Sequence, residues 1–253
     1  MGLGSQAGCQ SVGATTHNGL TIYVDGAGHW GDTCDGVRRG LEAAGYRGHV
    51  EEYVWTTSYN PLFDQWNVLA ARLRARGLAA RIRKYRRRHP DARLSIIAWS
   101  AGTGVATWAV ELLDGTTRID DLILLASSLS HDYDMTRAVA NVSGKIYVYH
   151  SRHDTVLKSV RVIGTIDGKR GVDSAGLVGL PCPTQLKGRI VNIGWSRDWL
   201  RHGWAGAHFD CITARFVRTC IAKHVVPDAH RPAIRRSLAY LGDSEVVALA
   251  HTQ

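Results

Sequence analysis

The most informative part of this chain is Leu94-Ser95-Ile96-Ile97-Ala98-Trp99-Ser100-Ala101-Gly102-Thr103-Gly104. An apolar, strand-like run ends at Ser100, and a helical pattern follows at once. The residues that flank the serine are small, as a tight strand-to-helix turn requires, because the two backbones nearly touch there. The pattern is that of a nucleophile elbow, Gly-x-Ser-x-Gly, with Ala98 in the place of the first glycine. Such a turn lifts the serine Oγ out of the sheet and places it beside a helix N-terminus.

Two later strand-like runs are followed by the residue types that a nucleophilic serine needs. Residues 145–149 lead to Asp154, and residues 189–195 lead to His208. A serine hydroxyl is a weak nucleophile, so it needs a base within hydrogen-bond reach, and an acid orients that base. The sequence therefore predicts Ser100 as the nucleophile, His208 as the base and Asp154 as the acid. The alternative is a structural role, in which Ser100 only caps the following helix as a small residue.

Other residues compete for two of these roles. His208 is preferred over His202 because small residues precede it and a helix-like run follows it. Further histidines also stand near the ends of expected strands: His29, His131, His150 and His153. Asp132 and Asp134 follow an earlier strand and are the alternatives to Asp154. Any of these aspartates would otherwise be a turn residue that caps the next helix.

A glycine-containing loop, Asp25-Gly26-Ala27-Gly28-His29-Trp30, follows the first clear strand. Acyl transfer develops an oxyanion, which fixed N–H groups must meet. We expect one donor to be the backbone N–H of Ala101 and the other that of Ala27, with Gly26 as the alternative. The glycines of the loop lack the spacing of a dinucleotide fingerprint, and the Lys-Ser/Thr pair of a P-loop is absent.

Strand-like and helix-like segments alternate along the chain. The expected strands are 20–24, 48–55, 94–99, 121–126, 145–149 and 189–194, and the expected helices are 34–44, 64–88, 101–113, 133–140 and 208–223. This alternation favours an α/β fold with a mostly parallel sheet and helices on both faces, in a compact version. Ligands of such sheets bind outside the carboxyl ends of the strands, where all the candidate residues are expected. We expect residues 1–18 to be a flexible segment and residues 19–253 to be a single domain.

The charge is concentrated in one place. The formal net charge is +9, and residues 72–88 hold nine of the Arg and Lys residues. If Leu69, Leu73, Ile82 and Tyr85 form an apolar stripe, the arginines are a solvated helix face. The alternative is a patch for a membrane surface. Aromatic residues are not interleaved as a nucleic-acid platform requires, so we expect no nucleic-acid partner.

The cysteines suggest where the protein is located rather than a fold held together by disulfide bonds. Ala7-Gly8-Cys9 resembles the end of a bacterial lipoprotein signal, which predicts an exported protein held at a membrane through Cys9. A cytoplasmic protein is the alternative. Five cysteines are too few for a disulfide scaffold. Cys211 and Cys220 are expected on one helix, too far apart to pair, whereas a bond between Cys34 and Cys182 is conceivable.

These motifs together resemble the α/β-hydrolase superfamily, with the Ala-x-Ser-x-Gly elbow found in some bacterial lipases and esterases. The resemblance covers about residues 20–224, and it departs from the common pattern at Asp25, where His precedes the glycine in many members. It implies a serine hydrolase that cleaves small-molecule or lipid carboxylic esters through an acyl-enzyme. Neither a cofactor nor a metal is expected, because the chain has no His-x-x-x-His or Cys-x-x-Cys pattern.

Two alternatives to ester hydrolysis stay open at this point. The same residues serve thioester or amide hydrolysis and acyl transfer, and the fold also suits a non-catalytic binding module. The stretch 157–186 is expected to be irregular and rich in glycine, and to form part of an acyl pocket or a partial lid. Its ordinary packing against the edge of the sheet is the alternative.

Overall fold

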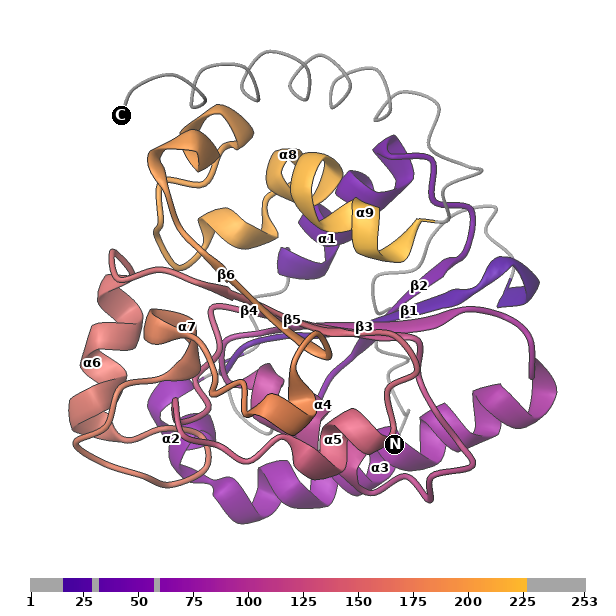
Figure 1. Cartoon of the computed structure of the whole chain (residues 1–253), viewed down its shortest axis with the longest axis horizontal. Coiled ribbons are helices and arrows are strands. Elements are labelled where there is room, and N and C mark those ends of the chain that lie inside the picture. The colour runs from indigo at the N-terminus through magenta and orange to yellow at the C-terminus, as the bar shows by residue number, and fades with distance from the viewer. Residues whose placement is uncertain (1–15, 29–31, 57–59, 227–253) are drawn as a thin grey trace, which may run out of the picture.

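The computed structural model describes residues 16–28, 32–56 and 60–226, and in this part of the chain a single sheet lies between two layers of helices (Figure 1). The strands are β1 (Leu20–Val24), β2 (His49–Tyr53), β3 (Leu94–Trp99), β4 (Asp121–Leu125), β5 (Ile146–His150) and β6 (Ile190–Gly194). Their order is β2-β1-β3-β4-β5-β6, and every neighbouring pair is parallel. The expected α/β class, with a parallel sheet and helices on both faces, is confirmed.

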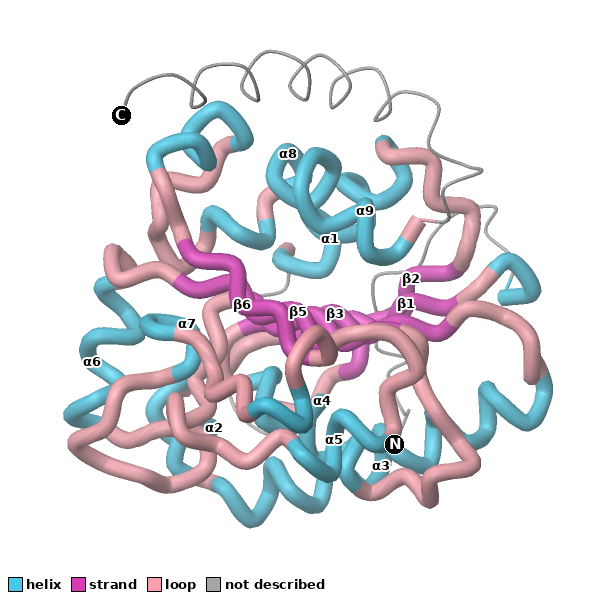
Figure 2. The backbone as a smooth tube through the Cα atoms, viewed as in Figure 1, coloured by secondary structure: helices cyan, strands magenta, loops and turns pink. Residues whose placement is uncertain are grey.

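The two faces of the sheet carry different helices (Figures 1 and 2). One face is covered by α1 (Thr33–Ala43), α8 (Ala214–Phe216) and α9 (Ala222–Val225), and the other by α3 (Val68–Arg88), α4 (Gly102–Glu111) and α5 (Thr136–Ala140). Side chains of a strand point alternately to the two faces. Within β3, Ile96 and Ala98 therefore join one buried apolar cluster, and Ile97 and Trp99 join the other.

The direction in which the chain winds reverses between β1 and β3. From β1 the chain crosses over α1 to β2, and from β2 it returns over α3 to β3 on the other side of β1. Parallel sheets bind ligands in the crevice that such a reversal opens at the carboxyl ends of the strands. The loop that starts at Asp25 follows β1 and the turn at Ser100 follows β3, so both lie at this edge.

The helix expected at 64–88 is divided into α2 (Pro61–Trp66) and α3. Asn67 separates the two helices, and its side-chain oxygen accepts a hydrogen bond of 3.1 Å from the Ala70 N–H. This cap satisfies one of the donors that a helix start leaves without an intrahelical partner. The expected end of the helix before Pro90 is confirmed, since α3 stops at Arg88.

The expected apolar stripe of α3 is wrong in its first half. Leu69 and Leu73 are 72% and 53% exposed, whereas Ile82 and Tyr85 are buried. The other buried residues of α3 are Ala71, Ala75, Leu78 and Ala79. Alanines suit this face because they allow α3 to pack closely on α4.

Several arginines of α3 have structural partners. Arg81 pairs with Glu51, Arg86 pairs with Asp120 at 3.0 Å, and the Arg72 guanidinium lies 4.5 Å from the centre of the Trp108 ring. These contacts tie one side of α3 to other elements. Most of the remaining cations of the helix are exposed, as expected for a solvated face. A role of this helix at a membrane surface stays a prediction.

Residues 157–186 are not irregular throughout, contrary to expectation. They contain most of α6 (Thr155–Ile163) and all of α7 (Ala175–Val178). Leu157 and Val160 lie about one turn apart on the buried face of α6, whereas Val162 is 80% exposed. The helix is hard to recognise in the sequence because β-branched residues favour strands.

The last expected helix begins later than residue 208. Residues 214–225 form one helical run in which α8 and α9 flank a π-helical segment, Val217–Ile221. Cys211 lies before this run in a 3-10 turn, so it does not share a helix with Cys220. The conceivable bond between Cys34 and Cys182 is also not formed.

Two expectations about the ends of the chain fall on residues that the structure does not describe. Cys9 and most of the expected flexible segment lie outside the described ranges, as do residues 227–253. Among the helices that are described, none combines the length and the apolar character needed to span a bilayer.

Candidate active site

Ser100 occupies a strained turn between β3 and α4. Its φ is +53°, in the left-handed region, which costs a non-glycine residue on the order of 1–3 kcal/mol. The turn is fixed to the neighbouring strand, because the Ser100 N–H donates a 3.0 Å hydrogen bond to the carbonyl of Leu125 in β4. A Cβ at Gly102 would lie 2.1 Å from the Asp25 carbonyl oxygen, so only glycine lets α4 start this close to β1.

The carbonyl oxygen of Ser100 is fixed by a directed chain of hydrogen bonds. It accepts from the Thr103 hydroxyl at 2.5 Å and from the Ser128 N–H at 3.3 Å. A hydroxyl has one hydrogen, so the contact of 2.9 Å between Thr103 Oγ1 and Ser127 Oγ requires Ser127 to be the donor. The Ser127 oxygen accepts in turn from the Leu129 N–H at 3.2 Å. The strained turn is thus braced by side chains from two separate segments.

His208 and Asp154 lie against Ser100. His208 Nε2 is 3.0 Å from Ser100 Oγ, and His208 Nδ1 is 2.7 Å from Asp154 Oδ2. The carboxylate only accepts hydrogen bonds, so it places the imidazole proton on Nδ1 and leaves Nε2 to accept from the Ser100 hydroxyl. Asp154 and His208 are only 2% and 5% exposed. The structure therefore brings together the three residues that the sequence indicated.

Two carboxylates shape the loops that carry the acid and the histidine. The second oxygen of Asp154 accepts from the Leu157 N–H at 2.9 Å, so the same side chain caps α6 and orients His208. In the loop before His208, Asp210 Oδ2 accepts from the N–H groups of Ala205 and Ala207 at 2.8 and 3.2 Å. Both loops are thereby organised by side chains rather than by a regular element.

Trp99, the residue directly before the candidate nucleophile, also holds the histidine. Its indole N–H donates a 3.0 Å hydrogen bond to the His208 carbonyl oxygen, and the centres of the two rings are 4.9 Å apart. Trp99 is 1% exposed. The end of β3 therefore provides two neighbouring parts of the site: Ser100 itself and Trp99, which fixes the backbone of His208.

The loop after β1 packs against Ser100. A Cβ at Gly26 would lie 3.2 Å from the Cβ of Ser100. The Gly26 N–H donates to Asp25 Oδ1 at 2.8 Å and the Gly28 N–H to Asp64 Oδ2 at 3.1 Å. Because a carboxylate already occupies the Gly26 N–H, the alternative that placed the oxyanion donor at Gly26 loses its support. Ala27 lies between these two anchored groups.

Ala101 is the other expected donor. It is fully buried directly after Ser100 and precedes the first residue of α4. Among the described residues, no group accepts a hydrogen bond from its N–H. The roles of Ala101 and Ala27 as oxyanion donors remain predictions.

The competing residues lie elsewhere. Asp132 pairs with Lys169 at 2.8 Å, and Asp134 bonds the N–H and the hydroxyl of Thr136. His202 ends a 3-10 turn, where burial and nearby arginines lower its pKa. His29 falls outside the described residues. The Ser100 hydroxyl is hydrogen-bonded to His208 and to none of three more histidines among the described residues: His131, His150 and His153.

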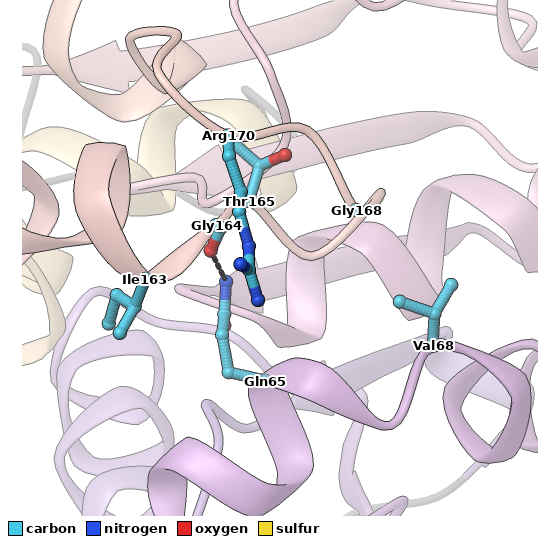
Figure 3. A pocket seen from close by; sticks show the side chains of 7 residues that line it. All are labelled: Gln65, Val68, Ile163, Gly164, Thr165, Gly168 and Arg170. Carbon is cyan, nitrogen blue, oxygen red and sulfur yellow. Dashed lines mark hydrogen bonds between the residues drawn. The ribbon is translucent and has the colours of Figure 1, made fainter.

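The apolar residues of the stretch 157–186 serve packing for the most part. Leu157, Val160 and Leu177 belong to the buried cluster on one face of the sheet. Ile163, at the end of α6, packs against the same cluster and also lines a pocket of about 190 Å³ (Figure 3). A role of this stretch as a lid stays a prediction. Within the described part of the chain, no group of three or more His, Cys, Asp or Glu residues is arranged to hold a metal ion.

Sequence reasoning missed the residues that brace the site. Thr103 and Trp99 stand within the motif that was recognised, next to Ser100, so their positions were a usable signal. Asp64 and Ser127 carry no such signal, because they reach the site from α2 and from the loop after β4.

Comparisons with known proteins add little to this picture. No family model matches the chain, and no curated protein does. Among solved structures, it is similar to the esterase Pf2001 of Pyrococcus furiosus, with 10% identity over 82% of each chain and a TM-score of 0.49. It is also similar to lipase B of Aspergillus fumigatus, with 12% identity over 80% of this chain and 51% of that chain and a TM-score of 0.48.

Proposed function

We propose that this chain is a serine hydrolase that cleaves carboxylic esters through an acyl-enzyme intermediate. One observation carries the proposal: a single line of hydrogen bonds runs from Ser100 Oγ through His208 to Asp154, with heavy-atom distances of 3.0 and 2.7 Å. These distances are within the reach that proton transfer requires. The line lies at the carboxyl edge of the sheet, where α/β proteins bind their ligands.

In the first half of the reaction, His208 Nε2 takes the proton of the Ser100 hydroxyl while Oγ attacks the ester carbonyl carbon. The carbonyl π electrons move to the oxygen, and the N–H groups of Ala101 and Ala27 receive the resulting oxyanion. When the tetrahedral intermediate collapses, the bond to the leaving oxygen breaks and His208 returns its proton to that oxygen. The alcohol leaves, and the acyl group stays on Ser100.

In the second half, water takes the place of the alcohol. His208 removes a proton from the water, the hydroxide attacks the acyl carbon, and Ser100 recovers its proton as the acid departs. Asp154 keeps its charge throughout and stabilises the imidazolium that forms twice per cycle. The acyl-enzyme is common to ester hydrolysis, thioester hydrolysis and acyl transfer. The first two reactions differ in the group that leaves, and acyl transfer differs from both in the acceptor.

The test is covalent labelling together with hydrolysis. A fluorophosphonate probe should modify Ser100, and p-nitrophenyl butyrate should be hydrolysed at a rate that Ser100→Ala lowers by about a millionfold. Ser159→Ala is the matched control, because Ser159 is an exposed serine on α6 whose hydroxyl donates to the Val156 carbonyl. If the folded wild type neither takes up the probe nor hydrolyses the ester, the hydrolase proposal is wrong and the alternative of a non-catalytic binding module is favoured.

A further inference from the structure

A pocket lies between α2 and the loop that follows α6 (Figure 3). Its volume is about 190 Å³, and it is lined by Gln65, Val68, Ile163, Gly164, Thr165, Gly168 and Arg170. A cavity of about 150 Å³ accommodates a ring of six carbon atoms. The pocket therefore has room for a short chain with a small polar group.

Arg170 gives the pocket its charge. Among the described residues that line it, Arg170 is the one charged side chain, and its guanidinium points toward Gln65 (Figure 3). Two nearby cations in the sequence have carboxylate partners. Lys169 pairs with Asp132 at 2.8 Å, and Arg161 pairs with Asp173 at 3.4 Å. No carboxylate of the described residues pairs with Arg170. Its guanidinium is therefore left to bind an anion from outside the chain.

Arg170 is exposed, and its stem packs on Gly164. A Cβ at Gly164 would lie 3.4 Å from the Cγ and 3.9 Å from the Nε of Arg170, so the stem of the arginine rests on this glycine. Gly164 has a φ of +112°, which few other residues adopt. A guanidinium offers two parallel N–H groups, which match the two oxygens of a carboxylate.

A second donor and two apolar side chains complete the pocket. Gln65 is 6% exposed, and its Nε2 donates a 3.0 Å hydrogen bond to the Gly164 carbonyl. The amide nitrogen carries another hydrogen, for which the described residues supply no acceptor. Val68 and Ile163 add aliphatic surface. The lining thus combines donors for an anion with contacts for a few methylene groups.

Both walls of the pocket are tied to the elements around Ser100. On one side, the Ile166 N–H donates to the Ser128 carbonyl at 3.0 Å, and the Ser128 N–H donates to the Ser100 carbonyl. On the other side, Asp64 precedes Gln65 in α2 and accepts from the Gly28 N–H in the loop after β1. A ligand held between these walls is thereby positioned relative to both halves of the candidate site.

We propose that this pocket binds the carboxylate end of the substrate, and that the natural substrates are monoesters of short aliphatic dicarboxylic acids. This inference rests on the proposed ester hydrolysis. The carboxylate bonds to Arg170 and Gln65, the methylene groups lie on Val68 and Ile163, and the ester end reaches Ser100. The pocket then selects substrates by charge as well as by length.

The test compares two esters of equal chain length, ethyl pentanoate and monoethyl glutarate, by the ethanol that each releases. The wild type should show a kcat/KM about tenfold higher for monoethyl glutarate, the effect of one charge-assisted hydrogen bond at a partly exposed site. Arg170→Gln should remove this preference by raising KM for monoethyl glutarate, and Arg170→Lys should restore part of it. Lys169→Gln is the control from the same loop and should keep the preference. Monoethyl succinate and monoethyl adipate complete the series, which should have one best length.

Binding of free glutarate separates this inference from the proposed hydrolysis. In titration calorimetry, Ser100→Ala should bind glutarate more tightly than acetate, and adding Arg170→Gln should abolish the difference. If the esters are not cleaved but this binding is observed, the hydrolase proposal fails and the carboxylate pocket stands. If neutral and anionic esters react equally in the wild type, or if Arg170→Gln slows both to the same extent, the pocket does not bind the substrate carboxylate. Equal circular dichroism and melting temperature of the variants establish that they fold.

Discussion

Ser100 and His208 lie 3.0 Å apart, yet the chain positions them in two different ways. Ser100 stands at the junction of a strand and a helix, where a strained backbone is braced by hydroxyl and peptide groups close in space. His208 lies on a loop, and its place depends on the side chains of Asp154 and Trp99, which come from distant parts of the sequence. The nucleophile thus depends on backbone geometry, and the base depends on two individual side chains. Substitutions on the two sides should therefore differ in what they damage.

The largest effect is expected from Asp154→Asn, on the side of the histidine. The asparagine keeps an oxygen for the Leu157 N–H but turns its amide donor toward His208 Nδ1. The imidazole then carries its proton on Nε2 and cannot accept from Ser100. We expect kcat for ester hydrolysis to fall by about ten thousandfold, while the fold is retained.

Asp132→Asn is the matched control for this substitution, since Asp132 was the competing acid and lies in an exposed ion pair with Lys169. It should leave kcat within about twofold, as expected for an exposed pair of this kind. Steady-state kinetics and the melting temperature decide the outcome. A loss of activity in Asp132→Asn equal to that in Asp154→Asn would mean that the acid has been assigned to the wrong strand.

The next effect concerns the side of the serine. Thr103→Val removes the donor to the Ser100 carbonyl and leaves the buried Ser127 hydroxyl without its acceptor. We expect a loss of about 1–3 kcal/mol in the free energy of unfolding, the cost of leaving such a buried group without its partner. Ester hydrolysis should slow by about tenfold, because a misplacement of well under 1 Å already matters at a reacting atom.

Thr107→Val is a close control, one turn later in the same helix. Thr107 is fully buried, and its hydroxyl has no hydrogen-bond partner among the described residues. Its replacement should therefore be neutral or stabilising in urea denaturation. Equal destabilisation by Thr103→Val and Thr107→Val would refute the directed chain of hydrogen bonds.

The contrast also explains which parts of the molecule could be predicted from the sequence. The region around Ser100 is encoded locally, as an apolar strand, small residues and a helix start, so its structure could be inferred from one stretch. His208 was identified from its position after a strand, but the residues that hold it could not be found in this way. Trp99 and His208 are 109 positions apart, and nothing in a single sequence indicates which carbonyl an indole N–H will meet.

The errors in the expected helices have the same origin. Asn67 is compatible with a helix interior, and only its capping contact with Ala70 shows that a helix begins there. Leu69 and Leu73 fit a helical stripe, but the face of α3 that packs on α4 is decided by the small residues that allow close approach. Local pattern predicts that a helix exists, whereas packing decides where it begins and which face is buried.

A smaller effect is expected from Trp99→Phe, which keeps an aromatic ring in the core but removes the donor to the His208 carbonyl. We expect kcat to fall by roughly threefold to tenfold with little change in KM, as the loss of one buried neutral hydrogen bond implies. Trp108→Phe is the control, because Trp108 is equally buried and donates to the Tyr133 hydroxyl in the other apolar cluster. The two variants should lose similar stability, but only Trp99→Phe should lower kcat. If both lower kcat alike, Trp99 acts through general stability and not through the histidine.

The smallest effect concerns pH, and it again falls on the side of the acid and the histidine. His150 ends β5, just before the loop that carries Asp154, and burial lowers its pKa, with Arg152 adding to the effect and a backbone hydrogen bond to Leu177 opposing it. The unfolded chain therefore takes up this proton at a higher pH than the folded chain. The contribution of His150 to stability is present above its ordinary pKa of about 6.5 and is lost as the pH falls toward the pKa of the folded state.

Urea denaturation at pH 8 and at pH 5 tests this expectation. The free energy of unfolding should differ less between the two pH values for His150→Gln than for the wild type. If His150→Gln leaves the pH dependence unchanged, the burial of the His150 imidazole does not lower the stability of the protein at low pH.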